Sequence, residues 1–146
     1  MTAPLYPVLS SSVTGPLGIK HLPRLWLKIL LHACGRLPDG YRHGAGGFDE
    51  FVTTTLGIDR DAFVAYIETE KPDYLTLETW VRANATSLTP EAIATINARV
   101  TNTDLPEAML PDRRASLGFD DPGYTKAVAL NDLDDWAGMH AALTRA

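Results

Sequence analysis

Polar side chains whose types could support acid–base chemistry gather around one glycine-rich stretch. Tyr41, His43 and Asp49 lie in or beside it, and two cations, Arg24 and Lys28, precede it. A histidine titrates near neutral pH and a carboxylate can orient its ring, which is the minimum for general acid–base catalysis. The same residue types also form structural ion pairs, and we favour an Arg24–Asp49 pair that ties a helix to the loop. These five residues are the candidate contact surface for a ligand or a partner.

The glycines of this stretch, Gly44, Gly46 and Gly47, are also compatible with a phosphate-binding loop. Backbone N–H groups at the start of a helix bind anions in many proteins. Here, however, Asp49 and Glu50 would occupy the first turn of the next helix, where they complement its dipole and repel a phosphate. The stretch also lacks the G-K-[ST] of a P-loop. We therefore interpret it as a flexible connector between two helices.

The sequence contains no motif for a metal. The four histidines form no H-E-x-x-H pattern, and the acidic run 132–135 lacks the central glycine and final glutamate of an EF-hand. Cys34 is the single cysteine, so it has no partner for an internal disulfide. On a mostly apolar segment we expect it to be a small buried hydrophobe. We predict no metal and no cofactor.

The elements that must position these residues are predicted to be helices. Apolar residues recur at helical spacing from Leu22 to Cys34, and Pro23 suits a first helical turn. Because this segment is apolar on nearly all sides, we expect it to be the central helix of the core. Residues 1–20 are rich in Pro, Ser, Thr and Gly without apolar periodicity, which predicts an extended or partly disordered arm.

Further helices are indicated by their start and stop signals. Asp59, Thr76 and Thr89 can act as N-caps, and Gly57 can end the preceding helix in a left-handed conformation. The helical period then predicts the buried faces, whose members include Phe63, Ile67, Leu77, Val81, Ile96, Asn97 and Val100. We expect Asn97 to be a core amide that bonds a neighbouring loop.

The last helix is predicted to begin at Asn131, which can cap it. The acidic run 132–135 would complement the positive end of its dipole. Trp136 lies on its apolar face and is expected to anchor the core. The sequence therefore predicts an all-α fold: a single helical domain at 21–146, built as an irregular bundle of about six helices, with the arm at 1–20.

Composition limits the class of function. The chain has 146 residues, a net charge of −5 and a pI near 5.2, so attraction to phosphate backbones is not expected. The longest apolar segment, Leu22 to Cys34, contains two cations and is too short to span a bilayer. The N-terminus lacks the pattern of a signal peptide. We predict a cytoplasmic protein that binds neither nucleic acid nor a membrane.

Several segments resemble a bacterial family of uncharacterised proteins, the domain of unknown function DUF5069. They are Leu22-Pro23-Arg24 with Lys28 one turn on, Gly40-Tyr41, Leu56-Gly57-Ile58-Asp59 and Phe63. The resemblance implies a small, mainly helical, cytoplasmic protein and no established activity, substrate or cofactor. In the family pattern a cysteine follows the tyrosine, whereas here His43 and glycines follow it. A cysteine-dependent function is therefore not expected.

Three functions remain open at this stage. Because no catalytic motif is complete, we favour a noncatalytic helical domain that binds a protein partner or a small molecule. The first alternative is a small enzyme that uses His43 and Asp49 as general acid and base. The second is a structural subunit of a homodimer, which predicts an exposed apolar patch around Trp136 and His140 on the last helix.

Overall fold

The computed structural model describes residues 3–145, which fold into helices joined by connectors of varied length. Within this range there are seven α-helices and one 3-10 turn: α1 (Leu22–Ala33), α2 (Gly47–Leu56), α3 (Arg60–Glu70), α4 (Tyr74–Asn84), α5 (Pro90–Asn102), η1 (Glu107–Met109), α6 (Leu110–Leu117) and α7 (Ala127–Thr144). The extended pairing in this range is an isolated antiparallel bridge between Asp104 and Lys126. The predicted all-α fold with an extended N-terminal arm is confirmed.

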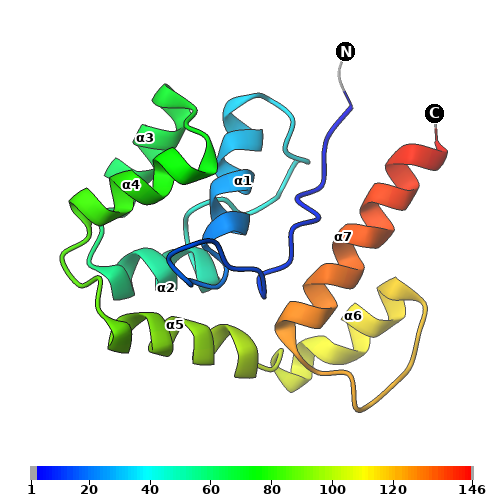
Figure 1. Ribbon diagram of the computed structural model, residues 1–146. Helices are drawn as coiled ribbons and strands as arrows, with labels where there is room; N and C mark the ends of the chain where they lie inside the picture. The colour runs from blue at the N-terminus through cyan, green and yellow to red at the C-terminus, as the bar shows by residue number, and fades with distance from the viewer. Residues whose placement is uncertain (1–2, 146) are drawn as a thin grey trace.

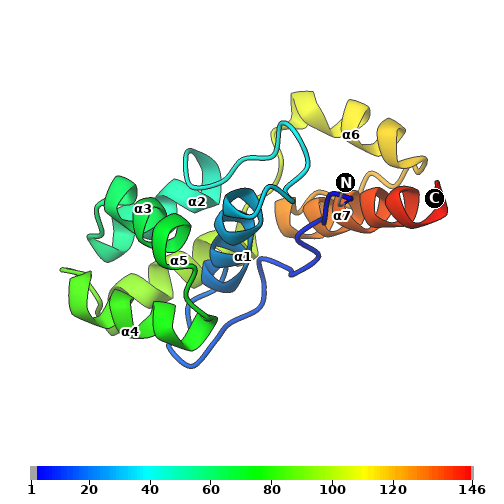
Figure 2. The same ribbon diagram turned by 90° about the horizontal axis from the view of Figure 1, so that it is seen from above.

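Helix α1 is central, as its all-round apolar pattern predicts. It contacts α2, α3 and α4, and Figures 1 and 2 show α3 and α4 on one side of it and α6 and α7 on the other. Leu22, Leu25 and Ile29 are fully buried. They pack with Phe63 of α3 and Leu77 of α4 in one core cluster. Each such side chain contributes about 1.5–3 kcal/mol through removal from water.

The N-terminal arm runs between α1 and α7 (Figure 1). Its Ile19 is fully buried in the core cluster. Asn97 of α5 fixes the end of the arm, since its side chain accepts a hydrogen bond from the Lys20 N–H and donates one to the Gly18 carbonyl, each 2.8 Å long. The prediction that Asn97 bonds a neighbouring loop is confirmed.

Two of the three predicted N-caps are confirmed. The side chains of Asp59 and Thr89 accept hydrogen bonds from the first turns of α3 and α5. The third prediction, Thr76, is wrong because Asp73 caps α4 and accepts the Thr76 N–H at 2.8 Å. A carboxylate three residues upstream is at least as good a cap as a threonine, so the helix gains a turn. Gly57 ends α2 in the left-handed conformation, as predicted.

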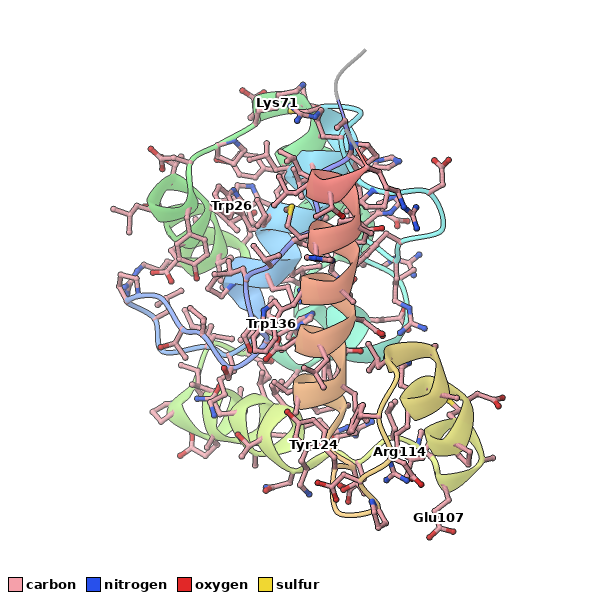
Figure 3. All side chains as sticks on the ribbon, turned by 90° about the vertical axis from the view of Figure 1, so that its right-hand side faces the viewer. Trp26, Lys71, Glu107, Arg114, Tyr124 and Trp136 are labelled. Carbon is pink, nitrogen blue, oxygen red and sulfur yellow. The ribbon has the colours of Figure 1, made fainter. Side chains whose placement is uncertain are left out.

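The last helix begins earlier than predicted. Helix α7 starts at Ala127, so Asn131 is not its cap and the acidic run 132–135 lies beyond the first turn. Ala127 and Leu130 are buried, and this apolar contact extends the helix upstream. The aspartates are therefore available for contacts with other segments. Trp136 is 57% exposed, so the prediction that it anchors the core is also wrong (Figure 3).

Cys34 is exposed, in contrast to the predicted burial. It is the C-cap residue of α1, just beyond the last helical turn, where the chain leaves the core. Its thiol is therefore accessible to solvent. Within the described residues, no helix combines the length and the apolar character needed to cross a membrane.

The bonds of Asn97 predict a cost for its removal. We expect Asn97→Ala to lower the free energy of unfolding by about 1 kcal/mol, because the half-buried Lys20 N–H and Gly18 carbonyl lose their partners. Urea unfolding followed by circular dichroism measures this. Asn102→Ala, at the exposed end of the same helix, is the control and should change stability little. Equal effects of the two substitutions would contradict this role of Asn97.

Candidate functional site

Three basic side chains lie on one face of the central helix and are almost completely buried. His21, the residue before α1, is 3% exposed, and Arg24 and Lys28 are each 5% exposed. Their spacing of three and then four residues places them on one stripe. Burial of charge is unfavourable unless each cation is paired and hydrogen-bonded. Carboxylates must therefore meet this stripe from elsewhere in the chain.

Asp49 of α2 is the first of these carboxylates. Lys28 Nζ lies 2.7 and 2.8 Å from its two oxygens, and His21 Nε2 lies 2.6 Å from Oδ1. Burial alone would raise the pKa of Asp49, but the hydrogen bond from His21 and the charge of Lys28 outweigh it and lower the pKa to about 2. Burial lowers the pKa of Lys28 and of His21, against the pull of Asp49. Asp49 is therefore ionised at neutral pH.

The glycine-rich stretch binds this same carboxylate. The Gly44 N–H donates to Asp49 Oδ2 at 2.8 Å, and Gly44, Gly46 and Gly47 all adopt positive φ angles. Glycine adopts such angles without the steric cost that other residues incur. The glycines thus allow the loop to direct the Gly44 N–H toward Asp49. They have this structural role before α2 and are not needed to bind a phosphate.

His21 links Asp49 to the N-terminal arm. Its Nδ1 lies 2.8 Å from Ser11 Oγ, so serine, histidine and aspartate are hydrogen-bonded in the order found in acyl-transfer triads. Ser11 is only 2% exposed and does not line the cleft described below, so a substrate cannot reach its oxygen. Lys28 also neutralises the aspartate. We interpret this chain of bonds as a structural connection between the arm and α2.

Asp135 of α7 is the second buried carboxylate and pairs with Arg24. Arg24 Nη1 lies 2.5 Å from Asp135 Oδ2 and also donates to the Pro7 and Leu9 carbonyls of the arm. The Tyr41 hydroxyl donates to Asp135 Oδ1. Arg24 therefore joins four segments: α1, the arm, the loop and α7.

A cleft of about 560 Å³ opens beside these buried pairs. Lys28, Arg24 and Asp49 lie at its wall, together with Tyr41 and His21. Around them stand residues from the loop, α5, the connector after α5, α6 and α7, which include Arg42, Arg99, Thr103, Leu105, Met109, Arg113, Asn131 and Asp134. The cleft thus lies between the N-terminal arm, α1, α2, α5 and the C-terminal helices, and α3 and α4 do not line it.

Four of the five residues predicted from the sequence line this cleft: Arg24, Lys28, Tyr41 and Asp49. His43 is not among the lining residues, and no hydrogen bond or ion pair joins it to Asp49 in the described part of the chain. Its ring stacks on His32 instead. The predicted Arg24–Asp49 ion pair is wrong, because Lys28 and His21 both bind Asp49, and Arg24 pairs with Asp135 instead.

Sequence analysis missed His21, Asp135 and three arginines of the cleft, which are Arg42, Arg99 and Arg113. One signal was available: two cations on a helix predicted to be buried require two carboxylates and further hydrogen bonds. His21 lies in register with them. The sequence does not show which aspartates pair with these cations, since Asp135 is 111 positions from Arg24.

The fold and the site define a small all-α domain with a charged cleft. Its sequence matches the profile described as Domain of unknown function (DUF5069) over residues 8–135. The chain belongs to this family, as its resemblance indicated. The matched range includes α1 to α6 and ends at Asp135, the buried partner of Arg24. Among curated proteins, none matches the chain.

The Lys28–Asp49 pair predicts a defined loss of stability. We expect Asp49→Asn to lower the free energy of unfolding at pH 7 by about 3–5 kcal/mol, because it leaves Lys28 buried without a counter-charge. Asp39→Asn, an exposed aspartate in the preceding loop, is the control. Urea unfolding of both variants measures the difference. A cost no larger than that of the control would contradict the pairing.

The lowered pKa of Asp49 predicts how the stability of the fold changes in acid. Its pKa is lower in the folded state, so its contribution is present above the unfolded value of 3.8 and is lost as the pH falls toward about 2. The shift corresponds to about 2 kcal/mol. Unfolding free energies measured between pH 5 and pH 2, on a roughly unit-spaced series, should therefore fall less steeply for Asp49→Asn than for the wild type. Parallel curves would contradict this assignment.

Proposed function

We propose that this protein is a noncatalytic binding domain whose cleft takes a small anionic molecule. The observation that carries the proposal is the charge of the cleft. Five basic side chains line it, against the two carboxylates Asp49 and Asp134: Arg24, Lys28, Arg42, Arg99 and Arg113. The chain as a whole carries a net charge of −5, so this excess of positive charge is local. A concave surface of one sign attracts ligands of the opposite sign.

Two of these cations are available to a ligand. Arg24, Lys28 and Arg113 are paired with Asp135, Asp49 and Asp134. Arg42 and Arg99 have no carboxylate within ion-pair distance among the described residues, and Arg99 lies over the Phe51 ring at 4.7 Å. Arginine binds carboxylates and phosphates through two parallel hydrogen bonds. The proposed ligand therefore carries at least one such group.

The dimensions of the cleft suit a metabolite-sized ligand. Its 560 Å³ lies within the range of about 300–1,000 Å³ that small-molecule sites occupy. Tyr41, Asn131 and Thr103 offer neutral polar groups, while Phe48, Leu105 and Met109 supply apolar surface. This mixture supports an organic anion with a polar and an apolar part.

The location that we propose is the bacterial cytoplasm, which the family resemblance implies. The single cysteine is exposed and free, and an exposed thiol remains reduced in that compartment. An enzyme built on His43 and Asp49 has no supporting contact among the described residues. The binding domain is therefore the function that the geometry supports best.

Anion binding is tested by substitution of the two free arginines. We expect citrate or pyrophosphate to bind the full chain in calorimetry, and Arg42→Ala and Arg99→Ala each to weaken binding about tenfold or more, because each loses charge-assisted hydrogen bonds. Arg82→Ala, an exposed arginine outside the cleft, is the control. Equal binding by all variants, or none of either anion at millimolar concentration, would contradict the proposal.

A second candidate function, assembly into a homodimer, has one specific observation in its favour. Trp136 and Leu143 of α7 are 57% and 71% exposed, and His140 between them is also exposed. The spacing of four and three residues forms a stripe along α7, beside a shallow apolar hollow lined by Leu117, Phe119, Tyr124 and Leu133. Two copies related by a two-fold axis could pair through this exposed face.

Sedimentation velocity tests the homodimer. We expect a dimer at micromolar concentration and a monomer for Trp136→Lys, because the substitution places a charge in the centre of an apolar contact. Leu75→Lys, which changes an exposed leucine on α4, is the control and should leave the dimer intact. A monomeric wild type would contradict this candidate and leave the anion site unaffected.

A further inference from the structure

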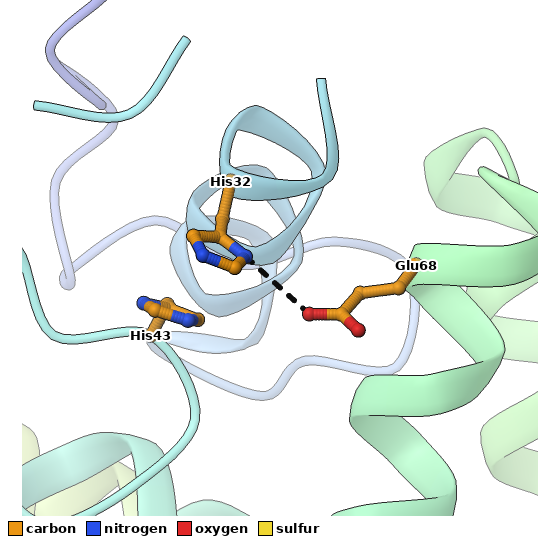
Figure 4. Close-up of side chains that lie close together, drawn as sticks. All are labelled: His32, His43 and Glu68. Atoms are coloured by element: carbon orange, nitrogen blue, oxygen red, sulfur yellow. Dashed lines mark ion pairs between the residues drawn. The ribbon is translucent and has the colours of Figure 1, made fainter. Parts of the chain in front are cut away.

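Three potential metal ligands from separate segments meet on the surface of α1, away from the cleft. They are His32 of α1, His43 of the glycine-rich loop and Glu68 of α3, and one ligand atom of each lies within 4.8 Å of the others (Figure 4). None of the three lines the cleft. We propose that they form a binding site for a divalent transition-metal ion, with Zn²⁺ as the preferred ion.

A hydrogen bond to the backbone sets the tautomer of His43. Its Nδ1 lies 3.2 Å from the carbonyl oxygen of Tyr41. A carbonyl only accepts hydrogen bonds, so Nδ1 carries the hydrogen and Nε2 of the neutral ring keeps its lone pair. Metal-binding histidines in proteins are usually oriented by this kind of bond to a backbone carbonyl. The loop therefore presents Nε2 of His43 as a ligand.

The distance between His32 and Glu68 also fits a shared ion. His32 Nδ1 and Glu68 Oε1 are 3.4 Å apart, which is an ion-pair distance and is marked by the dashed line in Figure 4. Two ligand atoms bound to one tetrahedral zinc at about 2.0–2.1 Å are separated by about 3.4 Å. The two side chains thus lie at the separation that a common zinc ion requires, and Figure 4 shows Glu68 pointing toward the histidines.

Binding requires one local movement. The His32 and His43 rings are stacked, with centroids 3.8 Å apart and planes 21° from parallel. The lone pair of an imidazole nitrogen lies in the plane of its ring, so a shared ion needs the two rings to tilt. The side chain of His32 is 49% exposed and that of Glu68 is 39% exposed, which leaves them free to turn. Metal binding therefore unstacks the two rings.

The ligand set favours zinc. Two neutral imidazoles and one carboxylate suit Zn²⁺, and three protein ligands leave a fourth position for water. The partners lie at positions 32, 43 and 68, a spacing that matches no metal motif, which is why the sequence alone predicted no metal. Bound zinc would join α1, α3 and the loop that carries Tyr41 and Arg42 to the cleft.

Zinc binding is tested with the tag-free full chain in competition with a chromophoric chelator. We expect one Zn²⁺ per chain, and affinity reduced about tenfold or more by His32→Ala, by His43→Ala and by Glu68→Gln, since each removes a ligand. His140→Ala and Glu70→Gln, both exposed and outside the cluster, should bind as the wild type does. Cys34→Ser should also bind normally, which distinguishes this site from an exposed thiol.

Two further results decide the outcome. Zinc should shift the side-chain NMR signals of His32 and His43, because their rings unstack, and leave those of His140 unchanged. Should His43→Ala fail to fold, the binding measured with His32→Ala and Glu68→Gln tests the site. The proposal is overturned if the wild type binds no zinc, if these variants bind as tightly as the controls, or if Cys34→Ser alone abolishes binding.

Discussion

The burial of two cations on the central helix is the constraint on which the rest of the structure depends. Arg24 and Lys28 lie inside the protein because α2, α7 and the N-terminal arm cover the face of α1 that carries them, and removal of each charge from water costs several kcal/mol. Only nearby opposite charges and hydrogen bonds offset that cost. Asp49 on α2 and Asp135 on α7 supply them, so two helices far apart in the sequence are fixed against the same stripe. Apolar packing holds α1 in the core, and the ion pairs fix α2 and α7 against its polar face.

The cleft follows from the same arrangement. Its inner wall consists of groups that the fold already requires, while its rim carries Arg42 and Arg99, whose charges the internal pairs do not balance. Stability and ligand attraction therefore depend on different members of one group of residues. This division explains how an acidic protein can have a cationic cleft. The carboxylates at the cleft are paired with basic side chains, and the other acidic residues lie outside it.

Local patterns predicted local structure well, and long-range partners could not be predicted. The helical period identified α1 and the buried faces with Phe63, Leu77 and Val100, because repetition over several turns outweighs single-residue noise. It failed for Trp136, where a short apolar stripe faces solvent. Four candidate site residues line the cleft, but the Arg24–Asp49 pairing was assigned incorrectly. Pairing depends on which helix face contacts which loop, and a single sequence does not show this. His21 and Asp135 were missed for this reason.

The attachment of α7 has a consequence for motion. The main core cluster draws its fully buried members from residues 19–100, and α7 adds only the partly buried Val128. Helices α6 and α7 are therefore held by a smaller apolar contact, which includes Leu110, Ala127 and Leu130, together with polar links such as Arg24–Asp135. Segments with fewer buried apolar contacts open at a lower free-energy cost than the main core, so α6 and α7 are expected to exchange their amide hydrogens sooner than α1. A ligand in the cleft would contact both α1 and α7, so it would hold α7 in place and slow amide exchange there.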